Sequence, residues 1–183
     1  SVAAYDRQTG KVLWTSLDGQ TGYVSPMQVT LLGVPQFLVV TATRLVGLSV
    51  DKRAVLWEFP WTTDHDANAA QPIVIDGTRV FYSSGYGTGA VVIELTKAGD
   101  RFTTREVWRN VRMKNRQSSS VFSNGFIYGL DDGILACLDA DLSLDLYEVA
   151  TGTLVFQKKS FYQPDLLGVI LLRLLISIEN DEQ

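Results

Sequence analysis

The stretch that decides the fold is AYDRQTGKVLW, residues 4–14. It begins as an apolar strand that ends at Asp6, and a second strand begins at Lys11. The Asp6 carboxylate can accept hydrogen bonds from backbone N–H groups two or three residues further on, and Gly10 supplies the positive φ that this turn requires. The stretch therefore predicts two antiparallel strands joined by a tight turn, with Trp14 on the second strand.

The same strand–turn–strand pattern recurs along the chain. It returns in residues 47–57, in residues 91–108 around a longer polar hairpin over residues 96–105, and in residues 146–156. Each copy carries one aromatic anchor on its second strand, and the four anchors are Trp14, Trp57, Trp108 and Phe156. The anchors are 43, 51 and 48 residues apart, which is the length of a four-stranded propeller blade.

A second marker repeats with the same period. A short polar step precedes an apolar strand at four places: Ser25-Pro26, Gln71-Pro72, Ser119-Ser120 and Gln163-Pro164. Two markers in a fixed phase predict an all-β fold, a partial β-propeller of about four four-stranded antiparallel blades with tryptophan-docked repeats. The phase places the end of a blade in residues 1–24, blades in residues 25–60, 71–110 and 118–158, and the start of a further blade in residues 163–183.

The four anchor aromatics are assigned to packing. A four-stranded sheet that is apolar on both faces must stack on its neighbours, and a large ring near its edge can cover the next blade, burying roughly 150–250 Å². Trp61 falls outside the repeat and has no packing role in this scheme. It is therefore a candidate for contact with a ligand.

Composition limits the classes of function. The chain has 183 residues, is 46% hydrophobic and carries a net charge of −4. A mildly acidic chain is a poor candidate for nucleic-acid binding, which needs clustered positive charge. No signal peptide is recognisable, and the most apolar stretch, residues 166–178, is interrupted by Arg173 and too short to span a bilayer. The single cysteine, Cys137, lies in an apolar run and is expected to be buried.

The motif of residues 4–14 resembles the repeat of pyrroloquinoline-quinone-type (PQQ-type) propellers. This group includes quinoprotein alcohol dehydrogenases and the outer-membrane-protein assembly lipoprotein family. The residues that carry the resemblance are Ala4, Asp6, Thr9, Gly10, Lys11 and Trp14. The resemblance implies a periplasmic or secreted protein and makes PQQ with calcium the cofactor to consider. Such propellers close with seven or eight blades, so we expect the rest of a longer chain or self-association to supply the missing blades.

The loop over residues 62–68 is the most polar cluster and contains the only histidine. Asp64, Asp66 and Asn68 alternate along it, as oxygen ligands do in loops that bind a hard cation such as Ca²⁺. The sequence lacks the following glycine and the distant glutamate of an EF-hand loop. The alternative interpretation is a solvated loop between blades that holds no metal.

A basic run occupies residues 109–117 and joins one blade to the innermost strand of the next, so part of it should face the rim of the central channel. Guanidinium groups make paired hydrogen bonds to carboxylates and other anions. The candidates for this ligand-binding rim are Arg112, Lys114, Arg116, Tyr86 and Trp61. The alternative interpretation is a solvated linker.

No catalytic arrangement is recognisable, because one histidine and one cysteine offer no arguable Ser-His-Asp or Cys-His set. We therefore interpret the chain as a non-catalytic scaffold whose loops and central channel bind a protein, a peptide or a small anionic ligand. The alternative is a fragment of a PQQ-dependent dehydrogenase, although the adjacent cysteines and the carboxylate-rich calcium site of those enzymes find no match here. A carbohydrate-active propeller would need paired carboxylates, and none can be nominated.

Overall fold

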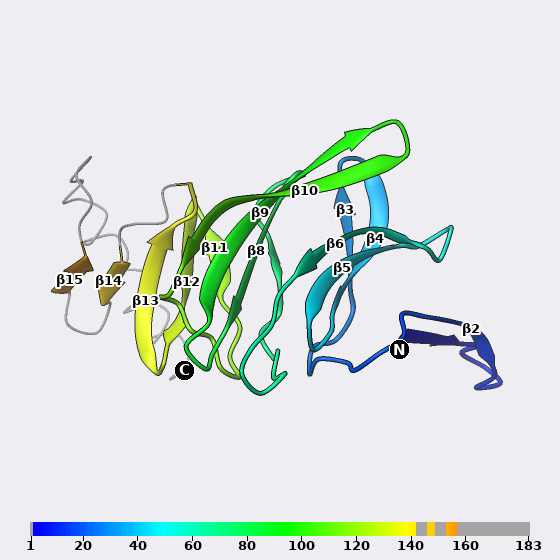
Figure 1. Ribbon diagram of the computed structural model, residues 1–183, viewed down its shortest axis with the longest axis horizontal. Coiled ribbons are helices and arrows are strands. Elements are labelled where there is room, and N and C mark those ends of the chain that lie inside the picture. Colours follow the sequence, from blue (N-terminus) through cyan, green and yellow to red (C-terminus); the bar gives the residue numbers. More distant parts are fainter. Residues whose placement is uncertain (1, 142–145, 149–152, 157–183) are drawn as a thin grey trace, which may run out of the picture.

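The computed structural model describes residues 2–141, 146–148 and 153–156, the last two segments by their backbone alone. These residues form β-strands joined by turns and loops. The strands make four antiparallel sheets that stand side by side like the segments of a fan (Figure 1). Within this part of the chain, no helix is long and apolar enough to cross a membrane. The sheets follow one another in chain order, as the blades of a propeller do.

Each sheet is a meander in which every strand pairs with the one before it. The first sheet pairs β1 (Val2–Tyr5) with β2 (Val12–Ser16). The second contains β3 (Met27–Leu31), β4 (Val34–Val40), β5 (Arg44–Ser49) and β6 (Val55–Pro60). The third contains β7 (Ile73–Val74), β8 (Arg79–Ser84), β9 (Gly89–Ala98) and β10 (Arg101–Asn110). The fourth contains β11 (Val121–Ser123), β12 (Phe126–Asp131), β13 (Ile134–Asp139), β14 (Leu146–Glu148) and β15 (Thr153–Phe156).

Aspartates close the turns after β1 and β7. The Asp6 carboxylate accepts hydrogen bonds from the backbone N–H and the hydroxyl of Thr9, both at 2.7 Å. Asp76 accepts the backbone N–H groups of Thr78 and Arg79, both at 2.8 Å. Partial burial acts to raise the pKa of Asp76, but the hydrogen bonds from Arg79 and Thr78 outweigh it and lower the pKa to about 2. These hydrogen bonds join residues two or three positions apart, so the local sequence is enough to specify both turns.

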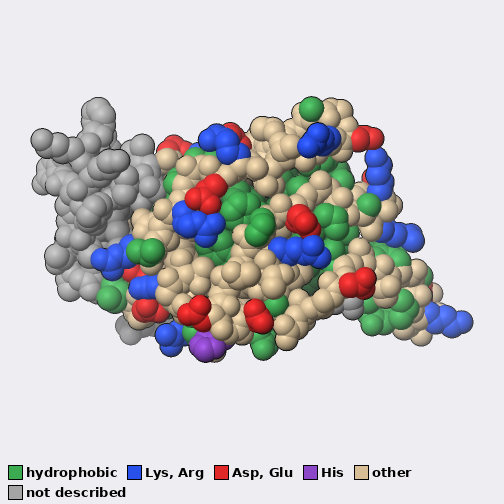
Figure 2. Space-filling view, in the orientation of Figure 1, with side chains coloured by type: hydrophobic (Ala, Val, Ile, Leu, Met, Phe, Trp, Pro, Cys, Tyr) green, Lys and Arg blue, Asp and Glu red, His purple; other side chains and the backbone are tan. Residues whose placement is uncertain are grey.

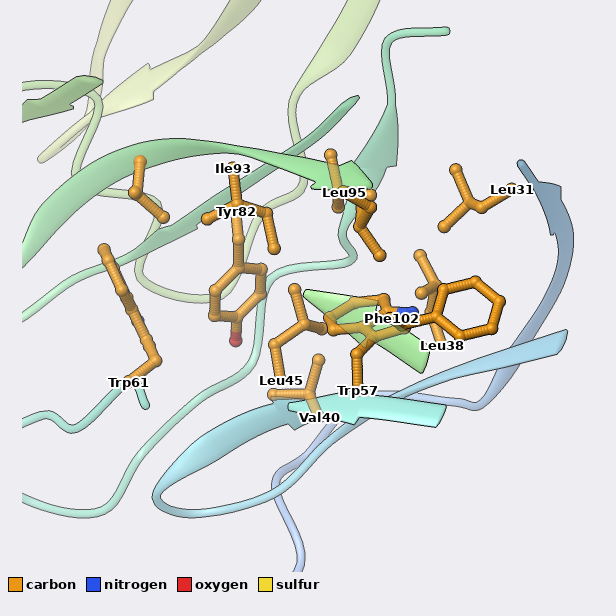
Figure 3. Close-up of a cluster of buried hydrophobic side chains, with 12 residues drawn as sticks. Leu31, Leu38, Val40, Leu45, Trp57, Trp61, Tyr82, Ile93, Leu95 and Phe102 are labelled. Carbon is orange, nitrogen blue, oxygen red and sulfur yellow. The ribbon is translucent and has the colours of Figure 1, made fainter. Parts of the chain in front are cut away.

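The sheets stack because each presents apolar side chains on both faces. Along β8, Val80 and Tyr82 belong to the cluster shared with the second sheet, whereas Phe81 belongs to the cluster shared with the fourth. Side chains that alternate along a strand make this division. Figure 3 shows the first of these clusters, in which Tyr82 and Ile93 point toward Leu45 of the facing sheet. The core therefore lies between the sheets.

The anchor tryptophans lie in these clusters. Trp57 is buried between the second and third sheets, and its Nε1 donates a hydrogen bond to Oε1 of Gln36 at 2.6 Å. Nε1 of Trp108 donates at 3.0 Å to the backbone oxygen of Ala140, just after β13 of the next sheet. Trp14 packs in the cluster between the first and second sheets. The side chain of Phe156 lies outside the described part of the chain, so its role stays a prediction.

The first strands of three sheets begin next to one another. Nε2 of Gln71 donates to the backbone oxygen of Ser25 at 3.2 Å, and its backbone N–H donates to the Ser119 hydroxyl at 2.9 Å. Because these residues precede β3, β7 and β11, those strands lie nearest the axis of the fan.

The links between sheets are residues 61–72 and 111–120. Because successive strands alternate in direction, these links lie on the same face as the β4–β5, β8–β9 and β12–β13 turns. We call this the connection face.

The fourth sheet differs from the expectation, whereas the hairpin expected over residues 96–105 is present and continues the ladder of β9 and β10. This long hairpin leans over β6 (Figure 1), and Phe102 is buried there. In the fourth sheet β13 already fills the third position, so residues 146–156 supply a fourth and a fifth strand. Residues 163–183, expected to begin a further blade, lie outside the described residues.

Candidate binding face

Three side chains from separate segments form a row on the connection face. His65, in the link between the second and third sheets, meets the ring of Tyr86 edge-on at a centroid distance of 5.1 Å. The guanidinium of Arg116, in the next link, lies 5.2 Å from the same centroid. The fold therefore places Tyr86 between an imidazole and a cation. We call these three residues the His65–Tyr86–Arg116 row.

The β8–β9 turn holds Tyr86 in a costly backbone conformation. Tyr86 has φ +57° and Gly87 has φ +78°, as in a type I′ hairpin turn, whose first position favours Asn, Asp or Gly. The corresponding positions of the β11–β12 and β12–β13 turns carry Asn124 at +52° and Asp132 at +49°. A left-handed conformation costs an ordinary residue roughly 1–2 kcal/mol. Leu32 holds the same conformation in the β3–β4 turn at +52°, so Tyr86 stands out by combining this conformation with its position in the row.

Acidic residues of the β12–β13 turn organise the basic link. The Asp131 carboxylate, which is 4% exposed, receives Nζ of Lys114 at 2.9 Å and the guanidinium of Arg112 at 3.5 Å. Nζ of Lys114 also lies 2.9 Å from Asp132. Partial burial acts to lower the pKa of Lys114, but its two carboxylate partners outweigh burial and raise it. The carboxylates of Asp131 and Asp132 thus already pair with Arg112 and Lys114. In the sequence, the only signal for these acidic partners is the Asp-Gly turn.

Arg116 is the cation of the link that faces solvent. Its side chain is 60% exposed, and it lies 3.9 Å from Asp132, at the limit of an ion pair. Its backbone is closely packed, because a Cβ atom on Gly85 would lie 2.9 Å from Cα of Arg116. A pocket of about 370 Å³ opens beside it, lined in part by Ser118, Leu130 and Asp132. This pocket and the row give the connection face a shaped, partly polar surface.

Two junctions between sheets use corresponding positions in different ways. Trp61 and Arg112 each stand four residues after the anchor tryptophan of the preceding strand. Trp61 bonds to Ser84 at the end of β8, and Arg112 pairs with Asp131 at the end of β12. A neutral aromatic contact therefore joins the second and third sheets, whereas a charged contact joins the third and fourth. The pocket lies beside the charged junction.

Trp61 does not contribute to the rim, contrary to the expectation. It is 2% exposed, and its Nε1 donates to the hydroxyl of Ser84 at 2.9 Å. Its ring meets Tyr82 edge-on at 5.6 Å, and the guanidinium of Arg109 covers it at 4.8 Å from the centroid. Trp61 fills the junction between two sheets, a packing role that its position outside the repeat does not reveal.

Asp64, Asp66 and Asn68 do not form the expected metal site. Asn68 is fully buried: its Nδ2 donates to two backbone oxygens of the β4–β5 turn, both at 3.0 Å, and its Oδ1 accepts the Ser84 hydroxyl at 2.7 Å. Asp64 and Asp66 are exposed. The Asn68 amide is thus committed to holding its link against the second sheet, and it is not available to a cation.

The described residues do not fit PQQ. Enzymes that use PQQ hold it beneath adjacent cysteines and beside a carboxylate-rich calcium site, whereas Cys137 is the single cysteine and is buried on β13. Across the described residues, no group of three His, Cys, Asp or Glu side chains is placed to hold a metal ion. We therefore derive no step through this cofactor.

Charge on the molecular surface is mixed. Figure 2 shows basic and acidic side chains interspersed over the face in view, with apolar side chains between them. Several are paired, such as Arg44 with Glu58 at 2.6 Å and Arg105 with Glu94 at 2.5 Å. Neither sign of charge dominates the face in view.

Comparison with known proteins assigns the chain to a family. A family model described as outer membrane protein assembly factor BamB matches residues 1–143. The chain belongs to this family. A solved structure of BamB from Moraxella catarrhalis is similar, with 16% sequence identity and a TM-score of 0.56, and the match covers 84% of this chain. The likeness to BamB confirms the all-β, partial-propeller fold that the repeats predict.

The chain spans less than half the length of that BamB, because the match covers 45% of the Moraxella catarrhalis protein. No curated protein matches the chain. The BamB family therefore describes the fold and the repeat, and the role of this chain must be argued from its own residues.

Proposed function

We propose that this chain is part of a non-catalytic scaffold that binds another protein, or a peptide segment of one, through its connection face. The family carries the name of an outer membrane protein assembly factor, and we place the chain in that process, in the periplasm. The single observation that carries the proposal is the His65–Tyr86–Arg116 row, in which two successive links and one turn meet on the same face.

The residue types of the row support protein binding. Tyrosine and arginine are enriched among the residues that dominate interface energies, because each offers a large contact area together with a directional polar group. Here both are held on short, well-packed segments, so little conformational entropy would be lost when a partner binds. Tyr86 is also half-buried and held in a left-handed backbone conformation. A scaffold that offers a preorganised aromatic–cation pair fits these facts.

Site-specific photo-crosslinking in cells tests the proposal. A photoreactive residue is placed at His65 or Tyr86 on the connection face, and as a control at Lys52, an exposed residue of the β5–β6 turn on the opposite face. We expect crosslinks from the first two positions to a component of the outer membrane protein assembly machinery, identified by mass spectrometry, and none from Lys52.

Crosslinks from Lys52 alone would move the interface to the opposite face and contradict the proposal. Products from all three positions in equal yield would show contact without a preferred face, and they would also contradict it. Absence of any crosslink from His65 and Tyr86, in cells where the protein is folded and abundant, would remove the row as an interface.

A further inference from the structure

The pocket beside Arg116 is lined mainly by polar residues, with Leu130 as its one aliphatic side chain. Arg116 and Ser118 come from the link between the third and fourth sheets, and Leu130 and Gly133 from the β12–β13 hairpin. Leu130 is 37% exposed although it is an aliphatic residue. The volume, about 370 Å³, falls within the range of small-ligand sites. A ligand for this pocket therefore carries one polar group and one small apolar group.

The charges around the pocket favour an anionic ligand. Three cations, Arg112, Lys114 and Arg116, face the two carboxylates of Asp131 and Asp132, which leaves one positive charge in excess. Of the two cations that line the pocket, Lys114 is the more tightly paired, with two carboxylates at 2.9 Å. The excess therefore resides on Arg116, whose contact with Asp132 is long at 3.9 Å.

The shape of that charge selects a carboxylate. A guanidinium presents two parallel N–H groups that match the two oxygens of a carboxylate. Asp132 lines the same pocket and is 41% exposed on its side chain, so an anionic group is best placed on the Arg116 side. Inorganic phosphate has no apolar group to contact Leu130, and this contact distinguishes it from a carboxylate on a carbon chain. The apolar side of the pocket, at Leu130, then receives the carbon chain that bears the carboxylate.

We propose that this pocket binds a carboxylate carried on an aliphatic group, supplied by a polypeptide as an acidic side chain beside an aliphatic residue or as an aliphatic C-terminal residue. The identity of the polypeptide rests on the proposed function, since it is the partner bound at the connection face. The pocket itself can be tested without that partner.

The test is an NMR titration of the full 183-residue chain with N-acetyl-L-leucine and, as the matched neutral ligand, N-acetyl-L-leucinamide. The readouts are the Nε–Hε signal of Arg116 and the methyl signals of Leu130. We expect saturable shifts with the acid in the millimolar range and none with the amide. Arg116→Gln should weaken binding by at least about tenfold, because a hydrogen-bonded charge is lost. Arg105→Gln, which alters an exposed arginine on β10, should leave binding unchanged.

Two blocked dipeptides separate the two sources of the carboxylate. Acetyl-Glu-Leu-amide offers an acidic side chain with a neutral chain end, and acetyl-Gln-Leu offers a free chain end with a neutral side chain. Binding of either one with the Arg116 and Leu130 shifts supports the proposal and names the source. Inorganic phosphate serves as the competing anion, and we expect it to bind more weakly than N-acetyl-L-leucine.

Equal binding of the acid and the amide, tighter binding of phosphate, or unchanged affinity in the folded Arg116→Gln variant would each overturn the proposal. So would the absence of any shift at Arg116 and Leu130. These outcomes leave the crosslinking at His65 and Tyr86 untouched, so a failure of the pocket is distinguishable from a failure of the proposed interface.

Discussion

Tyr86 has an unfavourable backbone conformation and contacts His65 and Arg116 at the surface. The backbone conformation at φ +57° costs less energy for asparagine than for tyrosine, because the short side chain of asparagine tolerates the left-handed region. We predict that Tyr86→Asn raises the free energy of unfolding by about 1 kcal/mol and abolishes the crosslinks from His65. Urea denaturation measures the first effect.

The reverse exchange in the β11–β12 turn is the matched control. Asn124→Tyr at φ +52° should lower the free energy of unfolding by about 1 kcal/mol and leave the crosslinks intact. If Tyr86→Asn instead destabilised the chain, the ring contacts of Tyr86 would be structural, and the argument for a binding role would lose its basis.

Gly47 makes room for an anchor tryptophan. It pairs with Trp57 across β5 and β6, and a Cβ atom at Gly47 would lie 2.1 Å from Nε1 of Trp57 and 2.5 Å from Oε1 of Gln36. Gly47→Ala should therefore displace a buried hydrogen-bonded pair and cost about 2–4 kcal/mol of stability. Gly77→Ala is the control, since a Cβ atom there has no neighbour within 4 Å. Equal denaturation midpoints for the two variants would contradict this account of Trp57.

The local sequence predicts the roles of residues whose partners lie nearby in the chain. It misses the roles of residues whose partners lie in another sheet. Asp6 and Trp14 can be read from one eleven-residue stretch, because a turn and a strand partner decide their roles. Trp61 and Asn68 share the partner Ser84 in the third sheet, which lies in another repeat. Their loop has the sequence of a polar, solvated segment, and only the stacking of the sheets buries Trp61 and Asn68 within it.

The β9–β10 hairpin is longer than the strands of an ordinary blade and holds the second and third sheets together. Phe102, near its tip, is buried in the cluster between the second and third sheets, and Thr104 donates to the backbone oxygen of Glu58 at 3.4 Å. We predict that Phe102→Ala costs about 3–5 kcal/mol and increases hydrogen exchange in β6 as well as in β10. The exposed neighbour supplies the control variant Thr103→Ala, for which both measurements should stay near those of the unaltered chain. Exchange confined to β10 would show that the hairpin does not hold the second sheet.

The elements of the first three sheets follow from the repeat, because several of their strands end at a turn with a recognisable signal such as Asp76-Gly77. The fourth sheet departs from it. A strand–turn–strand unit in residues 146–156 was expected to fill the outer half of a blade, but β13 already pairs with β12 at the third position. Strand pairing depends on contacts between separate segments of the chain, and a local motif does not contain that information.

Among the described residues, the first sheet leaves apolar side chains uncovered. Tyr5, Val12 and Leu13 are each more than half exposed on its two strands, although Trp14 packs toward the second sheet. We predict that the purified chain self-associates as its concentration rises, because covering such a surface is favourable. Light scattering coupled to size-exclusion chromatography measures the mass. Leu13→Lys should shift the chain toward the monomer, and a monomer at every concentration in the unaltered chain would contradict the prediction.

The charged junction beside the pocket has a mechanical consequence. An aromatic ring wedged between sheets, with directional hydrogen bonds on Ser84, resists sliding, because small displacements break its contacts. The attraction of Arg112 and Lys114 to Asp131 falls off gradually with distance, so it survives a shift of a fraction of an ångström. The ion pairs beside the pocket therefore tolerate small displacements of Arg112 and Lys114 that the Trp61 contact does not, while Trp57 and Trp108 hold the sheets themselves together at the two junctions.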